Sequence, residues 1–102
     1  MKYAALLQYT QDKALIADCR PKHRQHLQDL LAKGKLVMAG PFTDDSGAIL
    51  VYEVADEAEA KRCVETDPFH GAGVFVRYEL KPWKAVMCNR SLFQMDFLDK
   101  GL

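Results

Sequence analysis

The sequence predicts an α+β fold in which strands and helices follow one another in the order β-α-β-β-α-β around an antiparallel sheet. Three observations predict it. Four short apolar runs have the length of strands, two segments between them carry apolar residues at helical spacing, and a turn-forming cluster separates the middle two strands. A chain of 102 residues has room for one domain with a core of its own.

The first half of the chain begins with a strand and continues into a helix. Residues 2–9 (KYAALLQY) are short, apolar and flanked by aromatic residues, which is typical of a core strand. Residues 10–17 fit either a loop or a short helical turn. A helix is predicted over about 21–33, because Pro21 suits a first helical turn and Gly34 is a common C-terminal stop. Its apolar stripe consists of Leu27, Leu30 and Leu31.

A hairpin and a second helix follow. Residues 35–39 (KLVMA) and 48–54 (AILVYEV) are predicted strands, joined by the turn-forming residues 44–47 (DDSG). Asp56 is predicted to begin the second helix, because Glu59 three residues later completes a variant of the capping box. The apolar stripe of this helix consists of Ala60, Cys63 and Val64.

A loop and a fourth strand complete the predicted fold. Residues 66–71 (TDPFHG) are typical of a loop, and residues 73–80 (GVFVRYEL) of a strand that ends before Pro82 and Trp83. One face of this strand is predicted to carry Val74, Val76, Tyr78 and Leu80. The tail to residue 102 is predicted to form a further strand or a short helix. This order of elements is that of the ferredoxin-like fold.

Apolar residues on both faces of the predicted sheet indicate a homodimer. Two helices cover only one face of such a sheet. In the third predicted strand, Leu50 and Tyr52 point to one face, whereas Ile49 and Val51 point to the other. Large exposed apolar patches are rare on monomers, so two copies packed sheet against sheet would cover the second face. The apolar tail is expected to extend that contact or to build a larger assembly.

Charge and cysteine content give no reason to expect nucleic-acid or membrane partners, disulfides or a zinc site. Fourteen basic and 14 acidic residues give a formal net charge of zero. No apolar run approaches the ~20 residues that span a bilayer, and the start lacks the features of a signal peptide. Cys19, Cys63 and Cys88 are odd in number and widely spaced, as expected of reduced thiols. We therefore expect a soluble, cytoplasmic protein.

His23 and Asp67 are the candidates for acid–base chemistry. In a helix that begins at Pro21, free backbone N–H groups near His23 would favour the neutral imidazole that a general base needs. The alternative for His23 is a structural hydrogen bond to a loop carbonyl. Asp67, which precedes Pro68, either caps a turn or orients an imidazole or moves a proton itself. Arg20 either binds an anionic substrate or pairs with a surface carboxylate.

A metal site has less support. His26 follows His23 by three residues, and two such histidines can share a metal ion, but no further ligands stand nearby in the sequence. His26 is therefore expected to be a surface histidine. The sequence also lacks a phosphate-binding loop and a nucleophile elbow, and no metal or other cofactor is expected.

Short motifs in both halves of the chain resemble the YCII-related (YciI-like) family. The matching runs are RPKH (residues 20–23), MAGP (38–41), DPF (67–69), AGV (72–74) and KPW (81–83), together with Gly34. The likeness covers about residues 1–86, which would form one ferredoxin-like domain. Residues 87–102 would then be a C-terminal extension, expected at the oligomer interface.

The resemblance implies a dimeric ferredoxin-like α/β barrel with a pocket between the helices and the sheet. A His–Asp pair is proposed as the active site of that family, and His23 and Asp67 match the pair by position. The residues implied in binding the substrate are Arg20, Gly40, Pro41 and Phe69. Known relatives include a dehydrochlorinase that acts on a chlorinated hydroxyquinol, and muconolactone isomerases share the fold.

The leading hypothesis is a small cofactor-free enzyme that transfers protons, as a lyase or an isomerase, on a small cyclic or aromatic-derived compound. His23 would be the base, Asp67 would orient it or act as the acid, and Arg20 would hold an anionic group. The alternatives are a non-catalytic ligand-binding or accessory module, an interaction domain whose product is the dimer, and a cofactor-free monooxygenase.

Overall fold

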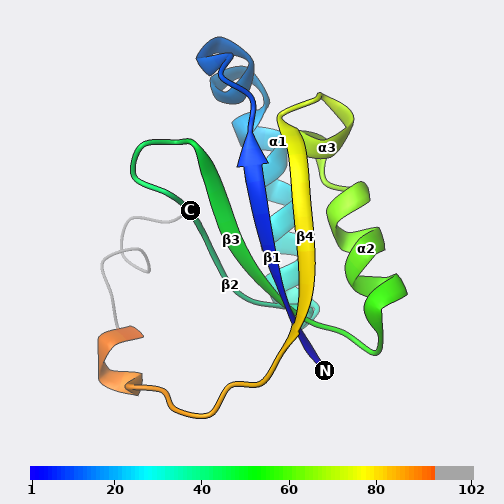
Figure 1. The fold of residues 1–102 in the computed structure, drawn as a ribbon, viewed down its shortest axis with the longest axis vertical. Helices are drawn as coiled ribbons and strands as arrows, with labels where there is room; N and C mark the ends of the chain where they lie inside the picture. The colour runs from blue at the N-terminus through cyan, green and yellow to red at the C-terminus, as the bar shows by residue number, and fades with distance from the viewer. Residues whose placement is uncertain (94–102) are drawn as a thin grey trace.

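A four-stranded antiparallel sheet with helices on one face forms the body of the protein in the computed structural model, which describes residues 1–93 (Figure 1). The strands, in the spatial order β2-β3-β1-β4, are β1 (Lys2–Tyr9), β2 (Leu36–Pro41), β3 (Gly47–Glu53) and β4 (Phe75–Trp83). The helices are α1 (Lys13–Ala32), α2 (Glu57–Glu65) and the single turn α3 (Pro68–Gly71). The predicted ferredoxin-like α+β class is confirmed, with α3 as an addition.

Helix α1 begins at Lys13 and not at Pro21 as predicted. Asp12 is its N-cap, and the Asp12 carboxylate accepts a hydrogen bond from the Leu15 N–H. Pro21 lies inside the helix, where its fixed φ is helical although the ring removes one backbone donor. A proline alone therefore does not mark a helix start. His23 lies in the middle of α1, so the expectation that N-terminal N–H groups act on its ring is wrong.

The predicted start of the second helix is confirmed. Asp56 caps α2 by accepting a hydrogen bond from the Glu59 N–H, and the Glu59 carboxylate accepts one from the Ala55 N–H. These two bonds form the variant of the capping box that the spacing predicts. They fix where the chain turns from β3 into α2.

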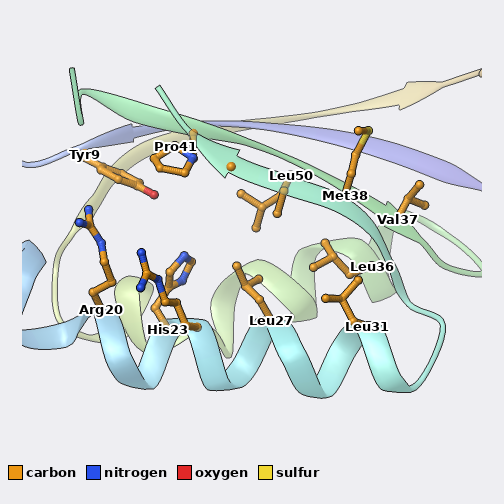
Figure 2. A pocket seen from close by; sticks show the side chains of 14 residues that line it. Tyr9, Arg20, His23, Leu27, Leu31, Leu36, Val37, Met38, Pro41 and Leu50 are labelled. Carbon is orange, nitrogen blue, oxygen red and sulfur yellow. The ribbon is translucent and has the colours of Figure 1, made fainter. Parts of the chain in front are cut away.

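Two strands continue beyond their predicted ends and each includes a proline. β2 continues through Gly40 and Pro41, and β4 continues through Pro82 to Trp83. Both strands are edges of the sheet, where one side of the backbone needs no ladder hydrogen bonds and a proline is tolerated. The longer β2 places Pro41 beside the N-terminal half of α1 (Figure 2).

A β-bulge corrects the predicted face of β4. Gln8 and Tyr9 of β1 pair with Arg77 and Phe75, which leaves Val76 as the extra residue. A bulge interrupts the alternation of side chains between the two faces. Val76 is therefore 55% exposed and does not lie in the core with the rest of its predicted face.

The core lies between the sheet and the helices, and apolar residues also occupy the opposite face of the sheet. Alternate residues of β1 and β3 are buried under α1, which lies behind the sheet in Figure 1. On the open face, Leu6 and Ile49 are cross-strand partners and are 40% and 43% exposed. The prediction of apolar residues on both faces is confirmed, whereas the homodimer stays a prediction. The main buried residues of β1 and β3 are Tyr3, Ala5, Leu7, Tyr9, Ala48, Leu50 and Tyr52.

Beyond Trp83, the tail contributes one short regular element, the 3₁₀ turn η1 (Arg90–Phe93). The remainder of the predicted tail element, residues 94–102, lies outside the described residues, and the division at residue 86 stays a prediction. Within residues 1–93, no helix has the length and apolar character needed to cross a membrane.

The position of the α1 cap can be tested by mutation. Asp12→Ala removes the acceptor for the Leu15 N–H and is expected to lower the free energy of unfolding by about 1 kcal/mol. Asp18→Ala is the control, because Asp18 is exposed, lies within the same helix and changes the net charge equally. Urea denaturation would measure both. Equal stability of the two variants would contradict the assignment of Asp12 as the cap.

Candidate functional site

His23 and Asp67 meet in the interior although they lie 44 positions apart in the chain. The Nδ1 atom of His23 lies 2.8 and 2.9 Å from the two carboxylate oxygens of Asp67. Both residues are buried, at 6% and 1% exposed. Because an ionised carboxylate can only accept hydrogen bonds, Nδ1 carries the proton and donates it. The Nε2 atom is then the ring nitrogen left for a ligand.

The short helix α3 holds the Asp67 carboxylate in place. Asp67 is the N-cap of α3, and its Oδ1 atom accepts a hydrogen bond of 2.9 Å from the Phe69 N–H. Pro68 occupies the first turn, where its missing N–H has no intrahelical partner to lose. The predicted loop 66–71 is thus largely a helical turn. The Asp67 carboxylate therefore does what both alternatives predicted: it caps a helical turn and it accepts a hydrogen bond from an imidazole.

Phe69 fixes the plane of the His23 ring. The two rings are stacked with centroids 3.9 Å apart and an interplanar angle of 5°. Phe69 is fully buried and packs edge-on against Tyr9 and Phe75. It lies behind the imidazole and is not among the residues that line the pocket described next.

A slot-shaped pocket of about 350 Å³ lies between α1 and β2, and the His23 ring is directed into it (Figure 2). One face of α1 forms the first wall, since the lining residues recur at helical spacing. They are Arg20, His23, Arg24, Leu27 and Leu31. The second wall is β2, whose Gly40 and Pro41 line the pocket as the sequence predicts. Gly40 is the cross-strand partner of Ile49, which lies on the open face, so its backbone and not a side-chain position lines the pocket.

Among the polar residues that line the pocket, the sequence-based prediction missed Tyr9 and Arg24. The Tyr9 phenol points toward the slot in Figure 2, and burial raises its pKa to about 12. Tyr9 therefore stays protonated near neutral pH and can donate a hydrogen bond. Arg24 lies four residues after Arg20, so helical spacing could have placed it on the pocket face. No comparable signal marks Tyr9, because its position depends on the pairing of β1 with the rest of the sheet.

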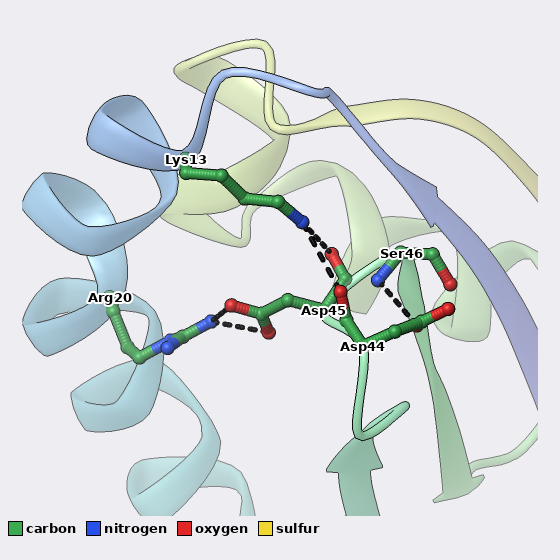
Figure 3. Close-up of polar contacts among 5 residues, drawn as sticks. All are labelled: Lys13, Arg20, Asp44, Asp45 and Ser46. Carbon is green, nitrogen blue, oxygen red and sulfur yellow. Dashed lines mark hydrogen bonds and ion pairs between the residues drawn. The ribbon is translucent and has the colours of Figure 1, made fainter.

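Arg20 lines the pocket while it is bound to the β2–β3 hairpin (Figure 3). Its Nη2 atom lies 2.7 and 2.8 Å from the two carboxylate oxygens of Asp45. Lys13 ties down the same hairpin by donating hydrogen bonds to the main-chain carbonyls of Asp44 and Asp45, at 3.2 and 3.4 Å. Asp45 has a φ of 61°, in the left-handed region. Of the two alternatives for Arg20, the structure thus shows the pairing with a carboxylate, that of Asp45.

His26 and the cysteines lie apart from this site or behind it. The Nε2 atom of His26 lies 3.1 Å from the Cys63 carbonyl oxygen, so His26 is half-buried and not at the surface as predicted. The Cys19 thiol donates to the Pro68 carbonyl at 3.5 Å, and burial followed by the charge of Asp67 raises its pKa. Within residues 1–93, no group of three or more His, Cys, Asp or Glu side chains is arranged to hold a metal ion.

Comparisons of the sequence and of the fold show which known proteins this chain resembles. The YCII-related domain matches residues 1–84. Protein YciI from Escherichia coli O6:H1 is 33% identical over 92 residues, which cover 76% of this chain and 94% of that protein, and the protein of the same name from Shigella flexneri gives the same values. A solved structure of 5-chloro-2-hydroxyhydroquinone dehydrochlorinase from Burkholderia phenoliruptrix AC1100, in complex with 2,5-dihydroxybenzoquinone, superposes with a TM-score of 0.73. It is 28% identical and covers 82% of this chain and 94% of its own.

The hydrogen bond between His23 and Asp67 predicts an unusual tautomer. At a pH where the imidazole is neutral, we expect the proton of His23 on Nδ1, because the carboxylate accepts it there. Nitrogen-15 NMR of the imidazole rings would identify the tautomer. In Asp67→Asn the amide oxygen can still cap α3, but the charged acceptor is gone, so the preference for Nδ1–H should weaken. A proton on Nε2 in the unmodified protein would contradict the assignment.

Proposed function

This chain belongs to the YCII-related family, and we propose that it is a cofactor-free enzyme that transfers a proton, as a lyase or an isomerase, on a small cyclic or aromatic-derived compound. The observation that carries the proposal is the buried His23–Asp67 hydrogen bond, with the imidazole directed into the pocket between α1 and β2. The structural likeness to a dehydrochlorinase that holds a benzoquinone supports an enzyme of this kind.

In this proposal His23 is the general base. Its Nε2 atom accepts a proton from the substrate, and the resulting imidazolium is stabilised by the Asp67 carboxylate at Nδ1. The same carboxylate holds the ring in one tautomer, while the stacked Phe69 ring limits its tilt. Little rearrangement is then needed when charge develops during the reaction.

An elimination at this site needs no reactant other than the substrate. Nε2 takes a proton from the substrate, the electrons of the broken bond form a new double bond, and the leaving group departs with its electron pair as an anion. The imidazolium then returns its proton to solvent. In an isomerisation, the imidazolium returns the proton to another atom of the substrate instead.

The remaining lining residues are proposed to bind the substrate at the His23 end of the slot. Arg20 lies there, and Gly40 and Pro41 lie across from it on β2. Tyr9 is protonated and can donate to a substrate oxygen on which negative charge develops. Phe69 would contribute through the position of the imidazole and not by touching the substrate.

Turnover by a His23 variant tests the proposed base. With a chlorinated hydroxyquinol as substrate, His23→Ala is expected to release chloride at least about 100-fold more slowly than the unmodified protein. His70→Ala is the matched control, because the His70 ring lies against Tyr78 and does not line the pocket. Chloride release and circular dichroism would be measured for both.

Each outcome of that experiment has a distinct meaning. Undiminished turnover by a folded His23→Ala variant would contradict the assignment of the base. Binding of such rings by the unmodified protein without their consumption would favour the alternative of a non-catalytic ligand-binding module. Consumption of oxygen would favour the monooxygenase.

We also propose that the protein is a homodimer packed through the open face of its sheet. Leu6 and Ile49 are paired at the centre of that face and are both substantially exposed, and Val76 is exposed on the neighbouring β4. The exposed apolar pair on this face favours a second copy as its cover. Residues 87–102 are proposed to form an extension that adds to the interface.

A charge placed on the open face tests the homodimer. Ile49→Lys is expected to convert a dimer into a monomer in analytical ultracentrifugation, because an unpaired ammonium group would be buried at the interface. Val86→Lys is the control, since Val86 is 77% exposed and lies outside the sheet. A monomeric unmodified protein would refute the dimer. Deletion of residues 87–102 tests the tail separately, and an unchanged number of chains per assembly would exclude it as an essential part of the interface.

A further inference from the structure

The pocket changes in character from one end of α1 to the other. Along α1, the wall begins with Arg20, His23 and Arg24 and continues with Leu27 and Leu31. At the apolar end, Leu36 of β2 lies beside Leu31 (Figure 2). None of the lining residues is acidic.

The two arginines of the pocket differ in whether a carboxylate pairs with their charge. Both oxygens of the Asp45 carboxylate bind the Arg20 guanidinium, which neutralises it. The ion pairs among residues 1–93 involve other cations and not Arg24. Within that part of the chain, Arg24 is therefore a pocket-lining cation whose charge has no carboxylate partner.

A pocket with a cationic end and an apolar end selects a ligand with the same division. A guanidinium binds a carboxylate more strongly than a neutral oxygen, because both the charge and the paired N–H donors are matched. The Tyr9 hydroxyl, which stays protonated, supplies a further neutral donor at the same end. Leucine side chains at the other end favour an apolar body of the ligand.

We infer that Arg24 is a specificity-determining residue that binds the carboxylate of a substrate with an apolar ring or chain, such as an aromatic or alicyclic monocarboxylate. This inference rests on the proposed function, in that it takes the slot beside His23 to be the substrate site. The carboxylate lies at Arg24, next to His23, and the apolar body lies along Leu27 and Leu31. Arg20, already paired with Asp45, shapes that end of the slot and is not the main anion-binding group.

Binding of a matched pair of probes tests the inference without turnover. Cinnamate and cinnamamide have nearly the same shape and differ in charge. We expect the unmodified protein to bind cinnamate at least about 10-fold more tightly than cinnamamide, as measured by calorimetry or NMR titration. In Arg24→Gln the affinity for cinnamate should fall about 10-fold, and the affinity for cinnamamide should change less than about 2-fold.

A second variant controls for the loss of net charge. Lys22→Gln removes one positive charge from the same helix at an exposed position outside the pocket, and should change the cinnamate affinity less than about 2-fold. Equal binding of the two probes by the unmodified protein, or an unchanged preference for cinnamate in Arg24→Gln, would overturn the inference. An equal loss in Lys22→Gln would overturn it as well.

The same probes separate this inference from the proposed catalysis. His23→Ala lacks the proposed base but retains Arg24, so it should keep the preference for cinnamate over cinnamamide. If Arg24→Gln also keeps that preference, Arg24 is not the anion-binding residue, whatever the turnover assay shows. If His23→Ala retains turnover while Arg24→Gln loses the preference, the proposed catalytic role fails and the specificity role of Arg24 stands.

Discussion

The hydrogen bond between His23 and Asp67 is the constraint on which the rest of this structure depends. Burial of a carboxylate is unfavourable unless hydrogen bonds compensate for the lost water, and Asp67 receives them from the imidazole and from the first turn of α3. Removal of the imidazole would leave the buried carboxylate short of a hydrogen bond, at a typical cost of about 1–3 kcal/mol. The position of α3 against α1 is therefore tied to a polar contact as well as to apolar packing.

Aromatic packing gives that contact its orientation. Phe69 follows Asp67 by two residues, so the turn that presents the carboxylate also presents the ring that stacks on His23. Tyr9 and Phe75 then hold Phe69 from the strand side. One nitrogen of His23 is thereby committed to the interior and the other is left to the pocket, which is the division that acid–base chemistry requires.

The edge position of β2 explains where the pocket lies. α1 packs across the sheet, and the space between α1 and the edge strand β2 is the slot, with Pro41 at one end (Figure 2). The β2–β3 hairpin closes over Arg20 through Asp45, and Lys13 binds the same hairpin (Figure 3). The cationic end of the pocket is thus built by α1 together with a turn that lies far from it in the sequence.

Much of this architecture follows from local signals in the sequence. The alternation of apolar residues and the DDSG turn determine the strands and the hairpin, and Asp56 with Glu59 determines the start of α2. These features depend on neighbours within a few residues, and the structure confirms them. The family resemblance brought His23 and Asp67 together by position, without a geometric reason for their contact.

What only the tertiary structure decided depends on contacts between distant segments. Pro21 suggested a helix start, yet α1 begins at the Asp12 cap, because packing against the sheet supports a helix that continues through the proline. The bulge at Val76 depends on the register between β1 and β4. The capture of Arg20 by Asp45, which leaves Arg24 as the uncommitted cation of the pocket among residues 1–93, arises where a hairpin meets a helix. The spacing of residues along the chain does not predict this contact between Arg20 and Asp45, because the contact depends on how the sheet and the helix pack.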